Sequence, residues 1–327
     1  MEQPRVSVVI PVFNCESSVA RAIDSILAQE FEGTEIVVVD DGSTDATPQA
    51  LDRYRDRVHV IRQENRGSPA ARNVGVEASR APYVAFLDAD DVWLAGRLEK
   101  TFAALDSAPD AVLAYADVIV VDERGQPTGG FGMSAHTARA PSLQDLLTKG
   151  WWPILPTTAL FRRDAYLAVG GFCEEFKGAR GFADVWFFLL MRERGRFIYL
   201  PEPLARYGSM PFLDRCEKYA PGFVTFSRLM TERHGAAGNR AVLIYAELNS
   251  RPLVEMGVRA MDAGQMKDAR RALLCAARYK RLDRRNLLRL MRAYLPVPIA
   301  LALASRKRRE RHGTARDRVA LQWTARK

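Results

Sequence analysis

The sequence lacks the patterns that mark several common protein classes. Its four cysteines, Cys15, Cys173, Cys216 and Cys275, are far apart and include no CxxC pair. This argues against a structural zinc site and favours a reduced, cytoplasmic protein. The phosphate-binding patterns GxxxxGK[ST] and GxGxxG are absent, so the P-loop kinase and dehydrogenase classes lack support. There is no internal repeat, and the polar residues 1–5 lead us to expect no signal peptide.

Negative charge is scarce towards the C-terminus. Residues 267–327 hold about 19 Lys and Arg against about 4 Asp and Glu, whereas residues 1–266 carry a slight acidic excess. The net charge of +9 therefore describes the tail and says little about the ligand of the rest of the chain. We expect no nucleic-acid partner, because the basic segment lacks interleaved aromatic side chains on which bases could stack.

Long hydrophobic runs are also lacking. The apolar run at residues 295–304 is about half of the roughly twenty residues that a membrane-spanning helix needs. It adjoins the basic segment 305–312, and the pair suits the surface of an anionic membrane. A solvated helix end is the alternative. On the first interpretation the protein is cytoplasmic and peripheral on the cytoplasmic face of the membrane.

Short apolar runs alternate with segments of helical spacing through the first two hundred residues. Strands are predicted at residues 5–12, 35–39, 58–61, 83–87, 111–121, 156–161 and 196–200. Helices are predicted at residues 17–29, 67–79, 94–105, 184–194, 241–263, 266–279 and 284–295. The alternation predicts an α/β fold with a mostly parallel central sheet and helices on both faces. We therefore expect a catalytic domain at 1–210 and a helical C-terminal region with a basic tail at 211–327.

Polar residues follow three of the predicted strands, at residues 11–14, 40–43 and 88–91. Ligands of parallel sheets bind beyond the carboxyl ends of the strands, so these residues are expected at one edge. Asp88 and Asp90 lie two positions apart after a buried strand, and their oxygen ligands suit Mn²⁺ or Mg²⁺ shared with substrate phosphates. The alternative is a solvated acidic turn.

Four segments, VSVVIPVFN, VVVDDGSTD, ENRGSPAARNVGV and VAFLDADDVW, follow one another in an order that resembles the family 2 glycosyltransferases. The resemblance covers roughly residues 4–207. It is most specific over the first hundred residues and resumes at PTTALFRRDAYLAVGGF and YLPEPLARY. It implies the Rossmann-like GT-A fold. It also implies metal-dependent transfer of a sugar from a nucleotide-diphosphate sugar to an acceptor hydroxyl, with inversion, in polysaccharide or glycolipid biosynthesis.

The resemblance assigns roles to residues of the first two motifs. Asp41 corresponds to the aspartate that accepts a hydrogen bond from the ring N–H of the base. Pro11 and Phe13 correspond to residues lining the base pocket, and Asn14 and Glu16 to a polar pair at the first turn.

The later motifs supply the other binding residues. Arg72 lies where a cation contacts the nucleotide, although a surface helix residue is the alternative. Asp88 corresponds to the first DxD position, near ribose and metal, and Asp90 to the metal ligand on the diphosphate. Asp91 is interpreted as a cap of the following helix.

The catalytic base is assigned to Asp184. The family has a Glu-Asp pair that opens a helix about eleven residues before a glycine, and Asp184 precedes Gly195 at that spacing. Ala183 stands where the family has Glu, which is a departure. A carboxylate at a helix N-terminus can remove the acceptor proton, whereas a plain N-cap is the alternative.

Two other functions stay open at this point. A sugar nucleotidyltransferase would need a Gly-rich basic loop after the first strand, which FNCESS does not supply. A nucleotide-sugar-binding protein without transferase activity is favoured slightly by Ala183. The expected partners are a nucleotide-sugar donor and a saccharide or lipid-linked acceptor.

Overall fold

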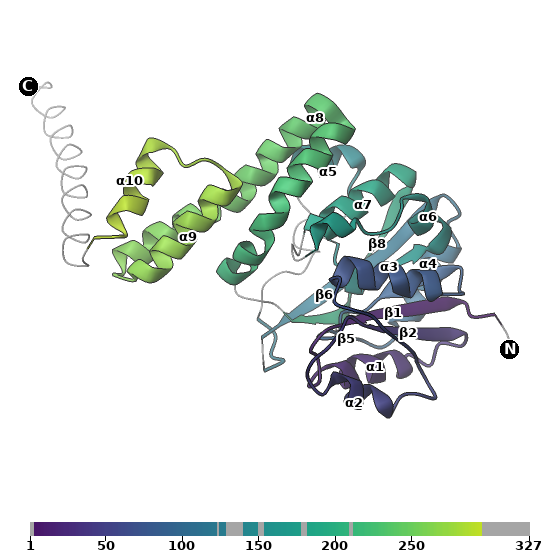
Figure 1. Cartoon of the computed structure of the whole chain (residues 1–327). Coiled ribbons are helices and arrows are strands. Elements are labelled where there is room, and N and C mark those ends of the chain that lie inside the picture. Colours follow the sequence, from purple (N-terminus) through teal and green to yellow (C-terminus); the bar gives the residue numbers. More distant parts are fainter. Residues whose placement is uncertain are drawn as a thin grey trace, which may run out of the picture. The chain divides into compact units, whose positions relative to one another are not determined.

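The computed structural model describes residues 3–122, 124–128, 140–149, 154–177, 182–208 and 212–295 (Figure 1). The basic tail from Pro296 onward, which the sequence links to a membrane surface, lies outside the described residues. The chain divides into two compact units. Unit 1 comprises Met1–Pro211 and Pro221–Val242, and unit 2 comprises Phe212–Ala220 and Leu243–Lys327.

Within the described part of unit 1, eight strands form one sheet in the order β3-β2-β1-β4-β7-β6-β8-β5. The strands are β1 (Val6–Val12), β2 (Thr34–Asp40), β3 (His59–Arg62), β4 (Tyr83–Phe86), β5 (Val92–Trp93), β6 (Ala111–Val121), β7 (Ala159–Arg162) and β8 (Arg196–Gly208). The first four in this order run parallel, as do β6 and β8, while β7 and β5 pair antiparallel with their neighbours. The predicted mostly parallel sheet is confirmed.

The helices of the described residues include the predicted ones and, unpredicted, Leu143–Lys149 and Arg163–Ala168, and the helix predicted at 241–263 begins at Phe212, with a kink at Gly235. They are α1 (Val19–Leu27), α2 (Thr47–Asp52), α3 (Ser68–Ala78), α4 (Arg97–Asp106), α5 (Leu143–Lys149), α6 (Arg163–Ala168), α7 (Phe182–Arg194), α8 (Phe212–Asp262), α9 (Met266–Tyr279) and α10 (Arg284–Arg292). The predicted strand at 156–161 begins instead with a 3₁₀ turn, Pro156–Thr158.

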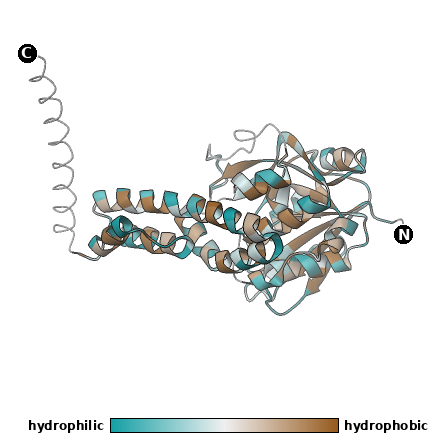
Figure 2. Ribbon diagram, turned by 90° about the horizontal axis from the view of Figure 1, so that it is seen from above, coloured by the Kyte–Doolittle hydropathy of each residue, from teal (hydrophilic) through white to brown (hydrophobic). Residues whose placement is uncertain are grey.

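Helices cover both faces of the sheet, as predicted. Successive strand residues point to opposite faces, so Val8 and Val9 of β1 meet different helices. Val8 belongs to a core shared with α1, α2 and α4. Val9 faces α3, where Gly75 allows close approach, because a Cβ there would lie 2.2 Å from Val9 Cγ1. Figure 2 shows the apolar strands enclosed between helices.

Unit 2 consists of helical segments with a small core of their own. Ala260, Met261, Met266, Ala269 and Ala293 form its apolar cluster. Arg271 donates to Asp214 at 2.7 Å and to Glu217 at 2.8 Å. No helix among the described residues is long and apolar enough to cross a membrane.

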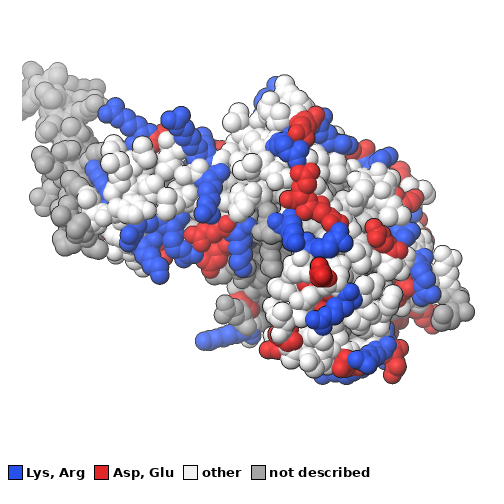
Figure 3. Space-filling model, viewed as in Figure 1, with Lys and Arg blue, Asp and Glu red and all other residues white. Residues whose placement is uncertain are grey.

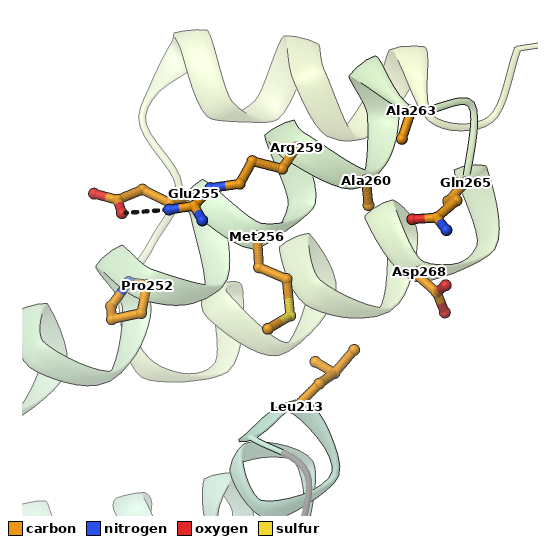
Figure 4. Close-up of a pocket in the computed structure, with 9 residues that line it drawn as sticks. All are labelled: Leu213, Pro252, Glu255, Met256, Arg259, Ala260, Ala263, Gln265 and Asp268. Carbon is orange, nitrogen blue, oxygen red and sulfur yellow. Dashed lines mark ion pairs between the residues drawn. The ribbon is translucent and has the colours of Figure 1, made fainter. Parts of the chain in front are cut away.

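A pocket of about 580 Å³ opens among the helices of unit 2 (Figure 4). Its apolar wall includes Leu213 and Met256, and Arg259 on its rim pairs with Glu255 at 3.7 Å.

Candidate functional site at the carboxyl edge of the sheet

The loops after β1 and β2 are joined by direct hydrogen bonds. Asn14 has a positive φ of 53°, a conformation that asparagine tolerates better than most residues. Its backbone N–H donates to Ser43 Oγ at 3.0 Å, and its Oδ1 accepts from the Thr44 N–H at 2.9 Å. Asn14 therefore acts first as a brace between two strand exits.

Glu16 makes a second brace of the same kind. Its Oε2 accepts from the Ala46 N–H at 2.8 Å, and its own N–H donates to Asp45 Oδ2 at 3.2 Å. The polar pair of Asn14 and Glu16 thus fixes the shape of the edge, while its predicted contact with a nucleotide stays a prediction.

Asp41 lies at the end of β2 and is only 3% exposed. Its Oδ1 accepts from Gln63 Nε2 at 2.7 Å and from the Arg66 N–H at 2.8 Å, and its Oδ2 accepts from the Gly67 N–H at 2.8 Å. An ionised carboxylate has about four acceptor positions, so about one is left for a ligand. Asp41 therefore holds the loop that opens α3 and keeps capacity for one further donor.

The predicted lining of the base pocket lies at the end of β1. Phe13 directly follows β1 and its side chain is 43% exposed, whereas Pro11, within β1, is half-buried. An exposed aromatic ring at a polar sheet edge has a free face for stacking.

Arg72 joins two distant parts of the chain. From α3, its guanidinium donates to Asp88 Oδ1 at 2.6 Å and to Asp184 Oδ1 at 3.1 Å. The residue is 5% exposed, so the alternative of a surface helix residue is wrong. Burial by itself would lower the pKa of Arg72, but the charges of Asp88 and Asp184 outweigh it and raise that pKa above its ordinary value.

The guanidinium of Arg72 also lies against two aromatic rings. Its guanidinium carbon lies 5.0 Å from the centre of the Phe172 ring and 5.6 Å from that of Phe86. Asn73 fixes Phe172 from both sides, since its Nδ2 donates to the Phe172 carbonyl and its Oδ1 accepts from the Phe172 N–H, each at 2.9 Å. Sequence reasoning assigned no role to Asn73 or Phe172, although Asn73 follows Arg72 within one of the quoted motifs.

The three aspartates after β4 have different surroundings. Asp88 is partly exposed and paired with Arg72, Asp90 is exposed, and Asp91 is buried. Burial raises the pKa of the Cys15 thiol, and the charges of Asp90 and Asp45 raise it further.

Asp91 is not a helix cap. It accepts a hydrogen bond from the Gly208 N–H at 3.1 Å, and α4 begins only at Arg97. Burial, followed by the charges of Asp88 and Asp90, raises the pKa of Asp91 well above its ordinary value. The cap interpretation is therefore wrong, and Asp91 is a buried carboxyl group beneath the acidic turn.

The acidic turn, residues 88–91, carries carboxylate oxygens, which are the ligands that a hard divalent cation prefers. The described residues contain no group of three His, Cys, Asp or Glu side chains that could enclose a metal. Mg²⁺ and Mn²⁺ sites commonly use one or two carboxylates and draw other oxygens from phosphates and water, and Asp88 and Asp90 meet that smaller need. The residues fit a cation held jointly with a diphosphate.

Asp184 is the third residue of α7, so it lies in the first helical turn rather than at the N-cap position. Its side chain is 28% exposed and its Oδ1 is oriented by Arg72. The structure thus brings the predicted base and the first DxD aspartate to the same guanidinium. Figure 3 shows acidic and basic side chains interleaved over one face of unit 1.

Comparisons with known proteins agree on one family. The sequence model described as "Glycosyl transferase family 2" matches residues 7–170. ExoO of Rhizobium meliloti, a succinoglycan biosynthesis protein, is 39% identical over 142 residues, which cover 43% of this chain and 40% of ExoO. EpsH of Bacillus subtilis is 41% identical over 97 residues, which cover 29% of this chain and 28% of EpsH. The chain thus spans less than half the length of these curated relatives.

The fold matches solved structures as well. The crystal structure of TarS residues 1–349 from S. aureus has a TM-score of 0.58 at 20% identity, covering 89% of each chain. The structure of the same fragment in complex with UDP-GlcNAc also has a TM-score of 0.58, at 18% identity, covering 88% of this chain and 84% of that one. At this identity the likeness supports the fold alone, and the predicted GT-A-like fold is confirmed.

Proposed function

The chain belongs to glycosyl transferase family 2, and from this membership we propose that it moves a sugar from a nucleotide-diphosphate sugar to an acceptor hydroxyl, with inversion. The observation that carries the proposal is the pairing of Arg72 with both Asp88 and Asp184. The pairing supports the proposal because it holds Asp184, the candidate base, and Asp88 of the acidic turn on one guanidinium. Such a juxtaposition is what a single displacement between two bound substrates requires.

Asp184 is the proposed general base. One carboxylate oxygen takes the proton of the acceptor hydroxyl while the acceptor oxygen bonds to the anomeric carbon. The bond from that carbon to the diphosphate oxygen breaks, and its electron pair leaves with the diphosphate. Attack from the side opposite the leaving group inverts the anomeric configuration. Arg72 orients the base, since it holds Asp184 Oδ1 at 3.1 Å.

The donor half of the proposal uses the edge loops. Phe13 stacks on the base beside Pro11, and Asp41 accepts a hydrogen bond from the base through its remaining lone pair. Asp90, with Asp88, would hold Mn²⁺ or Mg²⁺ together with the diphosphate. When bound, the cation neutralises charge that develops on the departing diphosphate. The structural neighbour TarS has been solved in complex with UDP-GlcNAc, which supports a nucleotide-sugar donor here.

The acceptor is proposed to be a growing polysaccharide or a glycolipid. The succinoglycan role in the name of ExoO supports this class of product. We place the enzyme on the cytoplasmic face of the membrane, with the basic tail beyond residue 295 as one attachment to anionic lipid. A lipid-linked acceptor would be concentrated at that surface.

One observation favours a binding protein without turnover. Ala183, which is buried, stands where the family has Glu, so one carboxylate is missing beside Asp184. Donor hydrolysis or transfer separates the two functions, because a binding protein leaves the donor intact.

The test is a screen of UDP-, GDP- and TDP-sugars with full-length protein and Mn²⁺. Thermal stabilisation identifies the donor, since a ligand that binds only the folded state raises Tm. Release of nucleoside diphosphate from that donor, with the acceptor glycan varied, then measures transfer. Asp90→Asn is expected to keep the fold while losing metal-dependent donor binding and most turnover. Wild-type turnover by Asp90→Asn, with the metal present or chelated, would refute the metal assignment.

A further inference from the structure

Helix α10 of unit 2 carries its apolar side chains on the outside. None of its residues is buried, although it is strongly amphipathic. The exposed side chains, here called the α10 apolar face, are Leu287 (49% exposed), Leu288 (46%), Met291 (60%), Tyr294 (61%) and Leu295 (37%). At about 100° per residue Leu287, Leu288 and Met291 fall on one side of the helix, and Tyr294 and Leu295 follow just past its end. Amphipathic helices of folded domains normally turn such a side inward.

The opposite side of α10 is the one that packs. Just past the helix end, Ala293 is 1% exposed and joins Ala260 and Met266 in the core of unit 2. Asn286 and Arg289, on the same side, are partly covered and bond to one another at 2.7 Å. The Tyr294 ring centre lies 5.3 Å from the guanidinium carbon of Arg270 in α9, so this ring also touches unit 2 although it is largely exposed. The segment is therefore fixed to unit 2, and the outward apolar face does not result from a detached helix.

The charges of α10 all have one sign. The helix contains Arg284, Arg285, Arg289 and Arg292 and no acidic residue. The Asp283 carboxylate just before it accepts from the Asn286 N–H at 2.7 Å and so caps the helix. Figure 3 shows basic side chains gathered over α9 and α10.

We propose that the α10 apolar face binds the surface of an anionic lipid bilayer. Leucine and methionine side chains enter the boundary between headgroups and acyl chains, while the arginines contact lipid phosphates. Helix α10, nine residues long, measures about 14 Å along its axis, well short of the roughly 30 Å hydrocarbon core, so the segment lies in the membrane plane. A second copy of the chain fits less well, because it would bring arginines against arginines.

This surface belongs to residues that the structure describes and is separate from the tail beyond residue 295. It deepens the proposed function in one respect, since it would hold the enzyme where a lipid-linked acceptor lies. Lipid binding is measured without turnover, so failure of one proposal leaves the other standing.

The test is co-sedimentation of full-length protein with vesicles of phosphatidylcholine alone or with about 30% phosphatidylglycerol. Leu287→Ser/Met291→Ser is expected to lower partitioning onto the anionic vesicles at least tenfold, including at 0.3 M salt, where long-range attraction is largely screened. The matched control Leu167→Ser/Val224→Ser removes two exposed apolar side chains from unit 1 and should bind like wild type. Unchanged binding by the α10 variant would overturn the proposal.

A second measurement places the helix in the lipid directly. Tyr294→Trp should gain fluorescence quenching by brominated acyl chains in anionic vesicles, relative to wild type. Absence of that gain would show that α10 stays in water and would also overturn the proposal. Light scattering tests whether a second copy of the chain binds this face instead. If the wild type is a dimer and Leu287→Ser/Met291→Ser is monomeric without loss of lipid binding, the face belongs to the dimer interface and the proposal is overturned.

Discussion

Charged side chains usually lie at the surface of a protein and apolar side chains in its core. The sheet edge of unit 1 departs from the first rule, and helix α10 of unit 2 departs from the second. Unit 1 buries a cation, Arg72, between two carboxylates and two aromatic rings. Unit 2 exposes leucines and a methionine that its core does not use. Burying a charge and exposing an apolar cluster both cost stability. Each feature therefore points to a function, because an apolar residue in place of Arg72 or a polar residue on α10 would avoid that cost.

The comparison separates two kinds of function. A buried cation paired with two carboxylates gives fixed geometry, which chemistry requires. An exposed apolar face on a fixed helix provides contact area without precisely positioned groups, and this suits binding to a fluid lipid surface. Variants in one region should therefore leave the function of the other unchanged, and the following experiments test that independence.

The largest effect is expected from Asp184→Asn. Loss of a general base lowers turnover by about a hundredfold to ten-thousandfold. Calorimetry should show nucleoside diphosphate still bound, and vesicle binding should be unchanged. Asp164→Asn, in the exposed first turn of α6, is the matched control. A turnover loss under threefold for Asp184→Asn would mean that the base lies elsewhere.

Arg72→Met should chiefly affect stability. Removing one partner of a buried ion pair costs about 3–5 kcal/mol, and the partial exposure of Asp88 and Asp184 favours the lower end. Urea denaturation measures the change in unfolding free energy. In the background Asp88→Asn/Asp184→Asn the same substitution should cost clearly less, because no unpaired carboxylates are left behind. Equal costs in both backgrounds would show that Arg72 stabilises through packing alone.

Much of unit 1 could be predicted because its strands are short, continuous apolar runs that end in turn residues. β8 was predicted to end at residue 200 but continues to Gly208. Its extension includes Pro201 and Pro203, residues that usually end strands, and register shifts opposite Asp117 accommodate them. The local sequence pattern of β8 contains no information on its pairing with β6, which supports this extension.

The candidate site was predicted residue by residue, but its connections were not. Arg72 and Asp184 are 112 positions apart, and no spacing rule relates them. The amphipathic pattern of α10 likewise predicts a helix with an apolar side, yet it does not say whether that side turns to a core or outward. Both facts depend on tertiary packing, which only the structure supplies.

A smaller effect is expected from Asp41→Ala. Loss of a hydrogen bond to a charged acceptor costs about 1.5–3 kcal/mol, so the Kd of free nucleoside diphosphate should rise about tenfold to a hundredfold. Turnover at saturating donor should fall less. Asp52→Ala, which removes an exposed carboxylate from α2, is the control. Unchanged affinity in Asp41→Ala would limit Asp41 to holding the Arg66 and Gly67 backbone.

The smallest effect is expected from a single charge on α10. Arg285 is exposed, and a Lys or Arg near an anionic membrane contributes about 1 kcal/mol. Arg285→Gln should therefore lower partitioning onto anionic vesicles about fivefold at 0.1 M salt, while donor turnover in solution stays at the wild-type level. The difference should shrink at 1 M salt, where the Debye length falls from about 10 Å to about 3 Å. Arg55→Gln, an exposed arginine of unit 1, is the control. An equal fall for both variants would mean that overall charge draws the protein to lipid, and that α10 has no special part in the contact.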